Sequence, residues 1–298
     1  MMNMTLKQLR YFEALARHGH FGRAAEASSI SQPALSVQIK ELEAGLGVSL
    51  FERGPRHVQL TGFGTEFAVR ARRILREVEE LGELARAAQS GDLGRLRLGI
   101  IPTIAPYLLP AVIARLAQSH PDLDVHVRET ITPRLVEELT QGRLDAAIVA
   151  LPISDPGLAE TTLFSEDLVL VRPGTEEGTL PPAREDLSER RLLLLEEGHC
   201  FRDQALAFCN ISPSRPREGL DGTSLTTLVQ MVGAGIGVTL IPEMAVPVET
   251  RSAPVCINRF SGKSPSRRVG MIWRKSSPLI PQLTQIADLI RAASQPSG

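Results

Sequence analysis

Residues 31–47 read SQPALSVQIKELEAGLG, and they predict a helix with one apolar face and one polar face. Ser31 is suited to cap the first turn, and Pro33 falls within that turn, where its missing N–H costs nothing. On one side of the helix, apolar residues recur at the spacing of a segment that packs on a core. These residues are Leu35, Ile39, Leu42 and Leu46.

The opposite face of this helix presents an amide, a hydroxyl and an ammonium group. Gln32 and Ser36 are placed to read base edges, and Lys40 is placed to reach a phosphate. This arrangement is typical of a helix-turn-helix whose second helix enters the major groove of DNA. A helical subdomain that only packs would give the same pattern, so both interpretations stay open on the residues alone.

The segments on either side complete the helix-turn-helix pattern. Residues 5–19 predict a helix that opens with a capping box of Thr5 and Gln8, and residues 21–28 predict a shorter one. Residues 51–64, FERGPRHVQLTGFG, predict a turn that could form a wing against the DNA backbone or minor groove. The cationic residues beside this turn are Arg53, Arg56 and His57.

A heptad pattern follows the wing. Apolar residues recur from residue 67 in alternating steps of four and three, which predicts the seam of a dimerising helix. A helix that packs on its own domain would show the same stripe. A dimer would present two recognition helices to a roughly palindromic operator. The seam residues are Phe67, Ala71, Ile74, Val78, Leu81, Ala85 and Ala88.

The remaining residues alternate between predicted strands and helices, which favours an α/β domain with a parallel sheet. GAGIGV at residues 233–238 follows a helix and precedes a strand, the reverse of a dinucleotide-binding turn, so we expect it to end the helix. Motifs for phosphate binding, zinc binding or nucleophilic catalysis are missing from the sequence. We therefore expect no enzyme, no cofactor and no metal site.

Composition sets the cellular context. The chain has 298 residues, enough for two or three domains, with 43% hydrophobic and 22% charged residues. Its net charge of −1 argues neither for nor against nucleic acid. The sequence contains no run of about 18 apolar residues, the length that a membrane span requires. Its N-terminus lacks an apolar signal core. We expect a cytoplasmic protein without a membrane partner, in a compartment where structural disulfides are rare.

Residues 196–209, EEGHCFRDQALAFC, hold two of the three cysteines of the chain. If the segment between them is helical, Cys200 and Cys209 lie about 13.5 Å apart along its axis. A disulfide needs Cα atoms within roughly 7 Å, so the two would bond only if the segment unwinds. The residues leave three interpretations open: inert buried thiols, a zinc site with His199, or a redox pair.

A family resemblance adds to these patterns. The string FGRAAEASSISQPALSVQIKELEAGLGVSLFERGPRHVQLTGFG, residues 21–64, resembles the winged helix-turn-helix of LysR-type transcriptional regulators almost end to end. The resemblance implies base and backbone contacts from Gln32, Pro33 and Ser36, and a wing contact from Arg53. Val37 stands where many members carry arginine, so one polar contact is expected to be missing.

The same resemblance implies a fold for the whole chain: a two-lobed α/β effector domain, like the periplasmic binding proteins, joined by a long linker helix to the winged helix-turn-helix. We expect the DNA-binding domain at residues 1–61, the dimerising linker helix at 62–92 and the regulatory domain at 93–298. The implied partners are promoter DNA, RNA polymerase and further copies of the chain, as a homodimer or homotetramer.

The second half is similar to the peroxide-sensing members of the family, which carry both cysteines at the same spacing. The matching strings are IPTIAPYLLP, EEGHCFRDQALAFC and GTSLTTLVQMVGAGIGVTLIPEMAVP. This resemblance implies that Cys200 reacts with hydrogen peroxide and that Cys209 then closes a disulfide. Cys200 has the more polar neighbours of the two, and Cys256 is expected to be structural.

The resemblance also implies which side chains hold the peroxide. Thr103 and Thr132 match hydroxyl positions of the family, although the string ETIT around Thr132 departs from the commoner form. His199 matches the family histidine beside the reactive cysteine. Arg202 and Asp203 complete the polar surroundings of the thiol, and Arg202 is placed to favour its thiolate.

Two rival functions remain. A LysR-type regulator that binds a small metabolite between its lobes would carry the cysteines incidentally, and its response would persist in a Cys200→Ser protein. A thiol peroxidase would turn over peroxide with a reductant and would not bind DNA.

Overall fold

The computed structural model describes residues 4–53, 58–90, 94–180, 187, 190–209, 221–260 and 264–293. The chain divides into two units, Met1–Gln89 and Ser90–Gly298, which we describe separately. Within the described residues, no helix has both the length and the apolar composition that a membrane crossing requires.

The first unit is a three-helix bundle with a short two-stranded sheet, followed by a long helix. The capping box of Thr5 and Gln8 is confirmed, and Ser31 caps the third helix by accepting a hydrogen bond from the N–H of Ala34. The Oε1 atom of Glu43 accepts hydrogen bonds from the N–H groups of Leu50 and the next residue, so the third helix also anchors the first strand. The elements are α1 Leu6–His18, α2 Phe21–Ala27, α3 Gln32–Leu46, β1 Phe51–Arg53, β2 Val58–Leu60 and α4 Gly62–Ser90.

The heptad stripe of α4 divides into two parts. Phe67 and Ala71 pack on the core of the same unit. Farther along the helix, the side chains of Ile74 and Leu81 are 40% and 65% exposed. Ala85 is exposed too. The first turns of α4 therefore pack on their own domain, and an apolar stripe continues beyond it on the uncovered part of the helix.

The second unit is built on a seven-stranded sheet in the order β10-β6-β11-β5-β3-β4, with β9 also paired to β6. Within this sheet, the predicted parallel pairing is correct for β3–β4 and β3–β5. It is wrong for the other pairs: β6 carries the chain to the far end of the unit, β9 and β10 pair antiparallel to it there, and β11 returns antiparallel to both β6 and β5. The sheet strands are β3 Arg95–Ile100, β4 Asp124–Glu129, β5 Ala146–Leu151, β6 Leu158–Pro173, β9 Thr239–Pro242, β10 Val255–Asn258 and β11 Ser266–Arg274.

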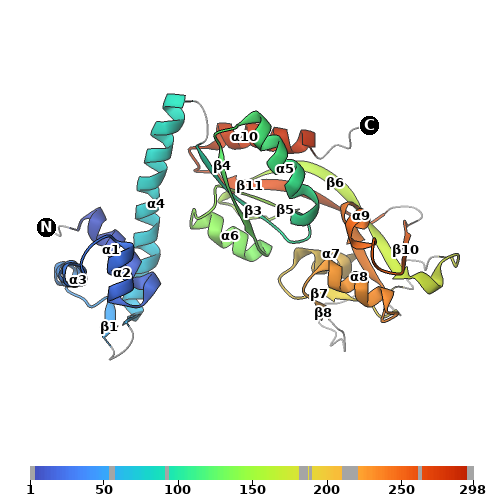
Figure 1. Ribbon diagram of the computed structural model, residues 1–298, viewed down its shortest axis with the longest axis horizontal. Helices are drawn as coiled ribbons and strands as arrows, with labels where there is room; N and C mark the ends of the chain where they lie inside the picture. The colour runs from blue at the N-terminus through green and yellow to red at the C-terminus, as the bar shows by residue number, and fades with distance from the viewer. Residues whose placement is uncertain are drawn as a thin grey trace. The chain divides into compact units, whose positions relative to one another are not determined.

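Two separate cores divide this unit into lobes. Lobe I comprises residues 94–167 and 266–293, and lobe II comprises the described part of residues 168–260. Helices α5 and α10 lie together on one side of the sheet of lobe I, and α6 lies on the other (Figure 1). The remaining elements are α5 Ala105–Ser119, α6 Thr132–Thr140, β7 Leu194–Leu195, α7 Cys200–Phe208, β8 Asp221–Gly222, α8 Leu225–Gly233, α9 Val246–Glu249 and α10 Ile280–Ala293, with short 3-10 turns at Gly174–Glu176 and Glu243–Ala245.

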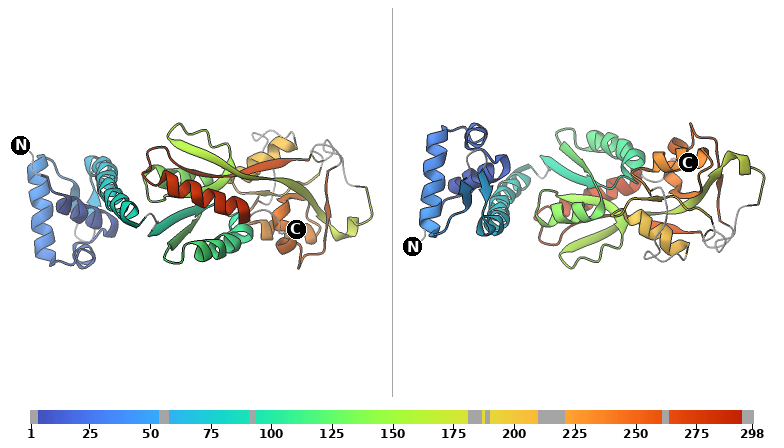
Figure 2. Two further views of the ribbon diagram at one scale, coloured as in Figure 1. Left: turned by 90° about the horizontal axis from the view of Figure 1, so that it is seen from above. Right: turned by 90° about the horizontal axis from the view of Figure 1, so that it is seen from below.

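Strand β6 runs through both lobes, as the long yellow-green ribbon in Figure 2 shows. Its first part pairs with β11 in lobe I, and residues 168–173 pair with β9 and β10 in lobe II. The segment 233–238 does end α8, and Gly235 there adopts φ +76°, a conformation that favours glycine. The dinucleotide interpretation of this segment is therefore excluded by its place in the fold.

Candidate redox and DNA-binding sites

Cys200 lies where the two lobes meet. It is the first residue of α7, and its side chain is half-buried against the core of lobe I. The same helix buries Phe201, Ala205 and Leu206 in the core of lobe II. The thiol of Cys200 is thus presented to one lobe by a helix that belongs to the other.

A narrow cavity brings the predicted peroxide residues together. Thr103, Thr132, His199 and Cys200 all line it, together with Ile101, Ile131 and Phe201. As it stands, the cavity is too narrow for a water molecule. The Oγ1 atom of Thr132 is buried and has no hydrogen-bond partner in the described part of the chain. A buried hydroxyl without a partner is costly, so this atom is available to a bound polar molecule.

Arg267, which the sequence did not single out, holds the other hydroxyl of this cavity in place. Its Nη1 atom donates to Thr103 Oγ1 at 2.8 Å, and its Nη2 atom donates to the Thr103 carbonyl at 2.9 Å. Arg267 is 2% exposed, and its charge is balanced by Glu166 at 2.7 Å. The guanidinium also lies 5.6 Å from the ring centroid of Phe201. Arg267 therefore fixes the hydroxyl of Thr103 and contacts the residue after Cys200.

A second buried contact joins the lobes near this cation. The hydroxyl of Tyr107 on α5 donates to Glu249 Oε1 on α9 at 2.7 Å. Burial raises the pKa of Tyr107 above its ordinary value, and the hydrogen bond to Glu249 adds to that shift. The phenol therefore stays a donor at neutral pH and keeps this bridge between the lobes.

His199 directly precedes Cys200 in the sequence. Partial burial lowers the pKa of His199 below its ordinary value, and the Glu196 carboxylate opposes this shift. The imidazole is therefore neutral near pH 7 and can either donate or accept a hydrogen bond in the cavity.

Helix α7 separates the two cysteines, as the sequence predicts. Cys209 is the C-terminal cap of this nine-residue helix and is buried in the core of lobe II. Helical rise then places Cys200 and Cys209 at opposite ends, about 13.5 Å apart along the axis. None of the three cysteines forms a disulfide in this structure.

The two charged residues expected near Cys200, Arg202 and Asp203, both lie on α7. The Nη1 atom of Arg202 donates to the Leu195 carbonyl at 2.8 Å and pairs with Asp221 at 3.0 Å. This guanidinium therefore ties α7 to the small β7–β8 sheet. Asp203 is exposed and lines a second, wider cavity that Cys200 also lines. Among the described residues, no group of three His, Cys, Asp or Glu side chains could hold a metal ion.

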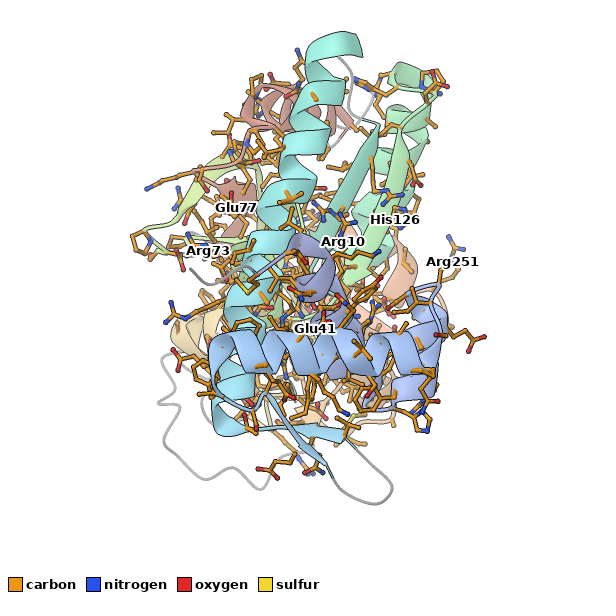
Figure 3. All side chains as sticks on the ribbon, turned by 90° about the vertical axis from the view of Figure 1, so that its left-hand side faces the viewer. Arg10, Glu41, Arg73, Glu77, His126 and Arg251 are labelled. Carbon is orange, nitrogen blue, oxygen red and sulfur yellow. The ribbon has the colours of Figure 1, made fainter. Side chains whose placement is uncertain are left out.

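The predicted DNA-reading face of α3 is open to solvent. Gln32, Pro33 and Lys40 are exposed and Ser36 is half-buried. Val37 is 51% exposed in the middle of this face. Helix α3 crosses in front of α4, with Glu41 on α3 and the residues Arg73 and Glu77 on α4 behind it (Figure 3). Arg53 is the last residue of β1, and Arg56 lies outside the described residues.

Comparison of the chain with known protein families identifies the family to which it belongs. Residues 6–65 match the model of the bacterial regulatory helix-turn-helix proteins of the lysR family, and residues 89–295 match the LysR substrate binding domain. The chain belongs to the LysR family. The two-lobed, periplasmic-binding-protein-like regulatory domain and the winged helix-turn-helix expected from the sequence are thereby confirmed.

Its relatives place the chain in the OxyR group of LysR-type regulators. It is 45% identical over 97% of its length, and 94% of the relative, to a probable hydrogen peroxide-inducible genes activator of Streptomyces viridosporus. A full-length cysteine-to-aspartate variant of OxyR from Pseudomonas aeruginosa is 38% identical with a TM-score of 0.78, covering 98% of this chain and 96% of that one. A cysteine-to-serine variant of Corynebacterium glutamicum OxyR, described as H2O2-bound, is 37% identical with a TM-score of 0.66, covering 98% and 92%.

Proposed function

We propose that this LysR-type regulator senses hydrogen peroxide through Cys200 and Cys209 and thereby changes its activity at promoter DNA. The observation that carries the proposal is the narrow cavity, in which the thiol of Cys200 shares its walls with Thr103, Thr132 and His199. The unpartnered hydroxyl of Thr132 suits a small molecule that both donates and accepts hydrogen bonds. Hydrogen peroxide is such a molecule, and this cavity has to open to admit it.

The chemistry proceeds in two balanced steps. The thiolate of Cys200 attacks one peroxide oxygen, the O–O bond breaks, and hydroxide leaves and takes up a proton to become water. Cys200 is then a sulfenic acid. The thiolate of Cys209 attacks the sulfenic sulfur, an S–S bond forms, and a second water leaves.

The second step requires a change of structure. The two sulfur-bearing residues are at opposite ends of α7, whereas a disulfide needs Cα atoms within roughly 7 Å. Helix α7 must therefore unwind, and Cys209 must leave the core of lobe II. The bond and the folded α7 exclude each other, so oxidation selects between two states of the regulatory domain.

The DNA-binding domain, residues 1–61, reads the promoter. Gln32, Pro33 and Ser36 contact bases or backbone in the major groove, Lys40 a phosphate, and the wing cations Arg53 and Arg56 the flanking backbone. Residues 62–92 form the dimerising linker and 93–298 the regulatory domain, in a homodimer or homotetramer that acts on RNA polymerase in the cytoplasm. The uncovered apolar stripe of α4 supports the dimer, since its apolar side chains remain exposed in a single chain.

The protein is proposed to be a regulator and not an enzyme. Each molecule of peroxide that reacts converts one chain to its disulfide form. The oxidised protein is itself the signal, so no catalytic turnover is needed. The decisive experiment treats the reduced protein with hydrogen peroxide, blocks remaining thiols, and maps the cysteines by mass spectrometry while binding to promoter DNA is measured. We expect a Cys200–Cys209 disulfide that a dithiol reverses, together with altered promoter binding.

A Cys256→Ser protein is the matched control. Cys256 lies on β10, outside α7, and its Sγ donates a hydrogen bond to the Pro173 carbonyl. The Cys256→Ser protein should respond like the wild type. If Cys200 remains a thiol in excess peroxide, the proposed function is wrong. A metabolite-dependent change in DNA binding that persists in Cys200→Ser would then favour the metabolite-responsive alternative.

A further inference from the structure

Val37 lies on the side of α3 that faces away from the core of the first unit. At about 100° per residue, the buried side chains of Leu35 and Ile39 each lie about 160° around the helix axis from Val37. These two residues are no more than 1% exposed, whereas Val37 is 51% exposed. Val37 therefore occupies the centre of the face that is proposed to enter the major groove.

Val37 is part of a short apolar row on this face. Pro33 and Ala34 precede it by four and three residues, which makes both of them its neighbours on the helix surface. Ala44 follows it by two turns, and all three of these residues are exposed. Valine forms a helix less readily than alanine, and at this exposed position it gains little from burial within the chain. Neither helix preference nor core packing therefore accounts for Val37.

The polar side chains that flank Val37 leave its position open to a partner. On one side, Gln38 Nε2 donates a hydrogen bond to Glu41 Oε2 at 2.8 Å, so these two side chains bond to each other. On the other side, Lys40 is exposed and is proposed to reach a phosphate. With α3 in the major groove, the group opposite Val37 is therefore the edge of a base pair.

Thymine is the base whose edge suits a valine. In the major groove, thymine presents a C5-methyl group, whereas the bases are otherwise recognised there by hydrogen-bond donors and acceptors. A donor or acceptor that valine covers loses its water and gains no partner, which costs free energy. The methyl group of thymine gains from the same contact, because both apolar surfaces leave water.

We propose that Val37 determines part of the operator specificity by contacting the C5-methyl group of a thymine. This inference rests on the proposed function, because it requires α3 to lie in the major groove of promoter DNA. Gln32 and Ser36 read hydrogen-bonding groups, and Val37 adds an apolar contact to them. The polar contact that is expected to be missing at this position is thus replaced by a methyl contact, and the operator carries a thymine there.

The experiment removes one methyl group from the DNA at a time. The full-length protein, both reduced and peroxide-treated, first selects duplexes from a library with a randomised centre, and the selected sequence is synthesised with a fluorescent label. In a series of duplexes, each thymine in turn is replaced by uracil, which lacks only the C5-methyl group. Dissociation constants are measured by fluorescence anisotropy at one fixed salt concentration, because binding to DNA depends strongly on salt.

The test variant is Val37→Ser, because serine and valine have similar helix preferences. The matched control is Val48→Ser, since Val48 is 41% exposed in the same unit but lies beyond the end of α3. Substitutions at such exposed positions change stability little. The uracil series with the wild type needs no substitution in the protein, so it tests the inference even if a variant folds poorly.

With the wild type, we expect a thymine whose replacement by uracil weakens binding by about fourfold, the factor that corresponds to burying one methyl group. In Val37→Ser, the duplexes with thymine and with uracil at this position should bind within about 1.5-fold of each other, because the methyl group has lost its partner. Val48→Ser should retain the difference between the two duplexes.

Two outcomes would overturn the inference: a wild type that binds every uracil duplex as tightly as the thymine duplex, or a loss on replacement by uracil that persists in Val37→Ser. Both leave the proposed function intact, because the protein still selects and binds an operator. If the protein selects no sequence in either redox state, the proposed function at promoter DNA fails, and the inference fails with it.

Discussion

Helices α3 and α7 carry the two proposed activities of this chain, and they are built in opposite ways. Helix α3 has 15 residues, a Ser31 cap at its start, and Gly47 in the left-handed conformation at its end. Helix α7 has nine residues, Cys200–Phe208, and Cys209 follows as its C-terminal cap. Among the described residues, no side chain caps its first turn at His199.

This difference matches what each helix has to do. Short helices are marginal without tertiary packing, and a cap contributes about 1 kcal/mol. Helix α3 is proposed to present its polar face to DNA whether the cysteines are reduced or oxidised, so strong ends suit it. Helix α7 has to come apart when a disulfide forms, so weak ends suit it. This contrast gives four tests of whether DNA recognition by α3 and peroxide sensing by α7 are independent.

The largest effect is expected from Gln32→Ala on α3. Loss of a bidentate base contact should weaken binding to the operator by about 1–3 kcal/mol, by the same amount in the reduced and the oxidised protein. Fluorescence anisotropy with labelled operator, measured with and without peroxide, checks this. Non-operator DNA of the same length is the control and should be affected less. A loss confined to one redox state would show that α3 takes part in the switch.

Removing the cap of α3 comes next. Ser31→Ala should lower the free energy of unfolding of the first unit by about 1 kcal/mol, because the N–H of Ala34 loses its acceptor. Urea denaturation followed by circular dichroism measures the change. Ser49→Ala is the matched control, since this exposed serine lies just beyond the helix and should change stability by less than about 0.5 kcal/mol. If both variants unfold at the same urea concentration as the wild type, the Ser31 cap does not contribute to the stability of the first unit.

Weakening α7 should favour the disulfide. Ala207 is exposed on this helix, and Ala207→Gly costs the helical state about 1 kcal/mol. The thiol–disulfide equilibrium should then shift about fivefold toward the disulfide, a midpoint potential about 20 mV lower. Titration in dithiothreitol redox buffers measures it. Ala44→Gly, at an exposed position of α3, should leave the potential unchanged. An unchanged potential in Ala207→Gly would mean that α7 does not unwind on oxidation.

The smallest effect concerns pH. Because burial lowers the pKa of His199, the unfolded chain binds a proton at this site more readily than the folded one. Its contribution to stability is therefore present above about pH 6.5, the ordinary pKa of histidine, and is lost as pH falls below that value. Melting temperatures of wild type and His199→Gln between pH 7.5 and 5.5 test this. The variant should show the shallower decline, and parallel curves would contradict the assignment.

Much of the first unit, and the short helix between the two cysteines in the second unit, could be predicted from the sequence. The capping box at Thr5, the cap at Ser31 and the helix between Cys200 and Cys209 all depend on residues within one or two turns of each other. Such local preferences are visible in sequence patterns. The grouping of Thr103 and Thr132 with the reactive cysteine came from family resemblance, since spacing alone does not bring such distant residues together.

The rest depends on contacts between distant residues. Arg267 meets Thr103 and Glu166 across 164 and 101 residues, and no local pattern distinguishes it from the surface arginine beside it. Arg202 turns toward Asp221, a partner that only the β7–β8 pairing brings near. The antiparallel course of β6 and β11 was missed for the same reason, because alternation of strands and helices indicates parallel neighbours.

Strand β6 links the unfolding of the two lobes, although each lobe has its own hydrophobic core. One continuous strand supplies backbone hydrogen bonds to both lobes, through residues 158–167 in lobe I and residues 168–173 in lobe II, so melting of either lobe frees the strand up to the first paired residue of the other. The two lobes should therefore unfold in one cooperative calorimetric transition. If a Cys200–Cys209 disulfide unwinds α7 as proposed, the change in the stability of lobe II should reach lobe I through this strand, and the oxidised domain should melt as one body at a new temperature.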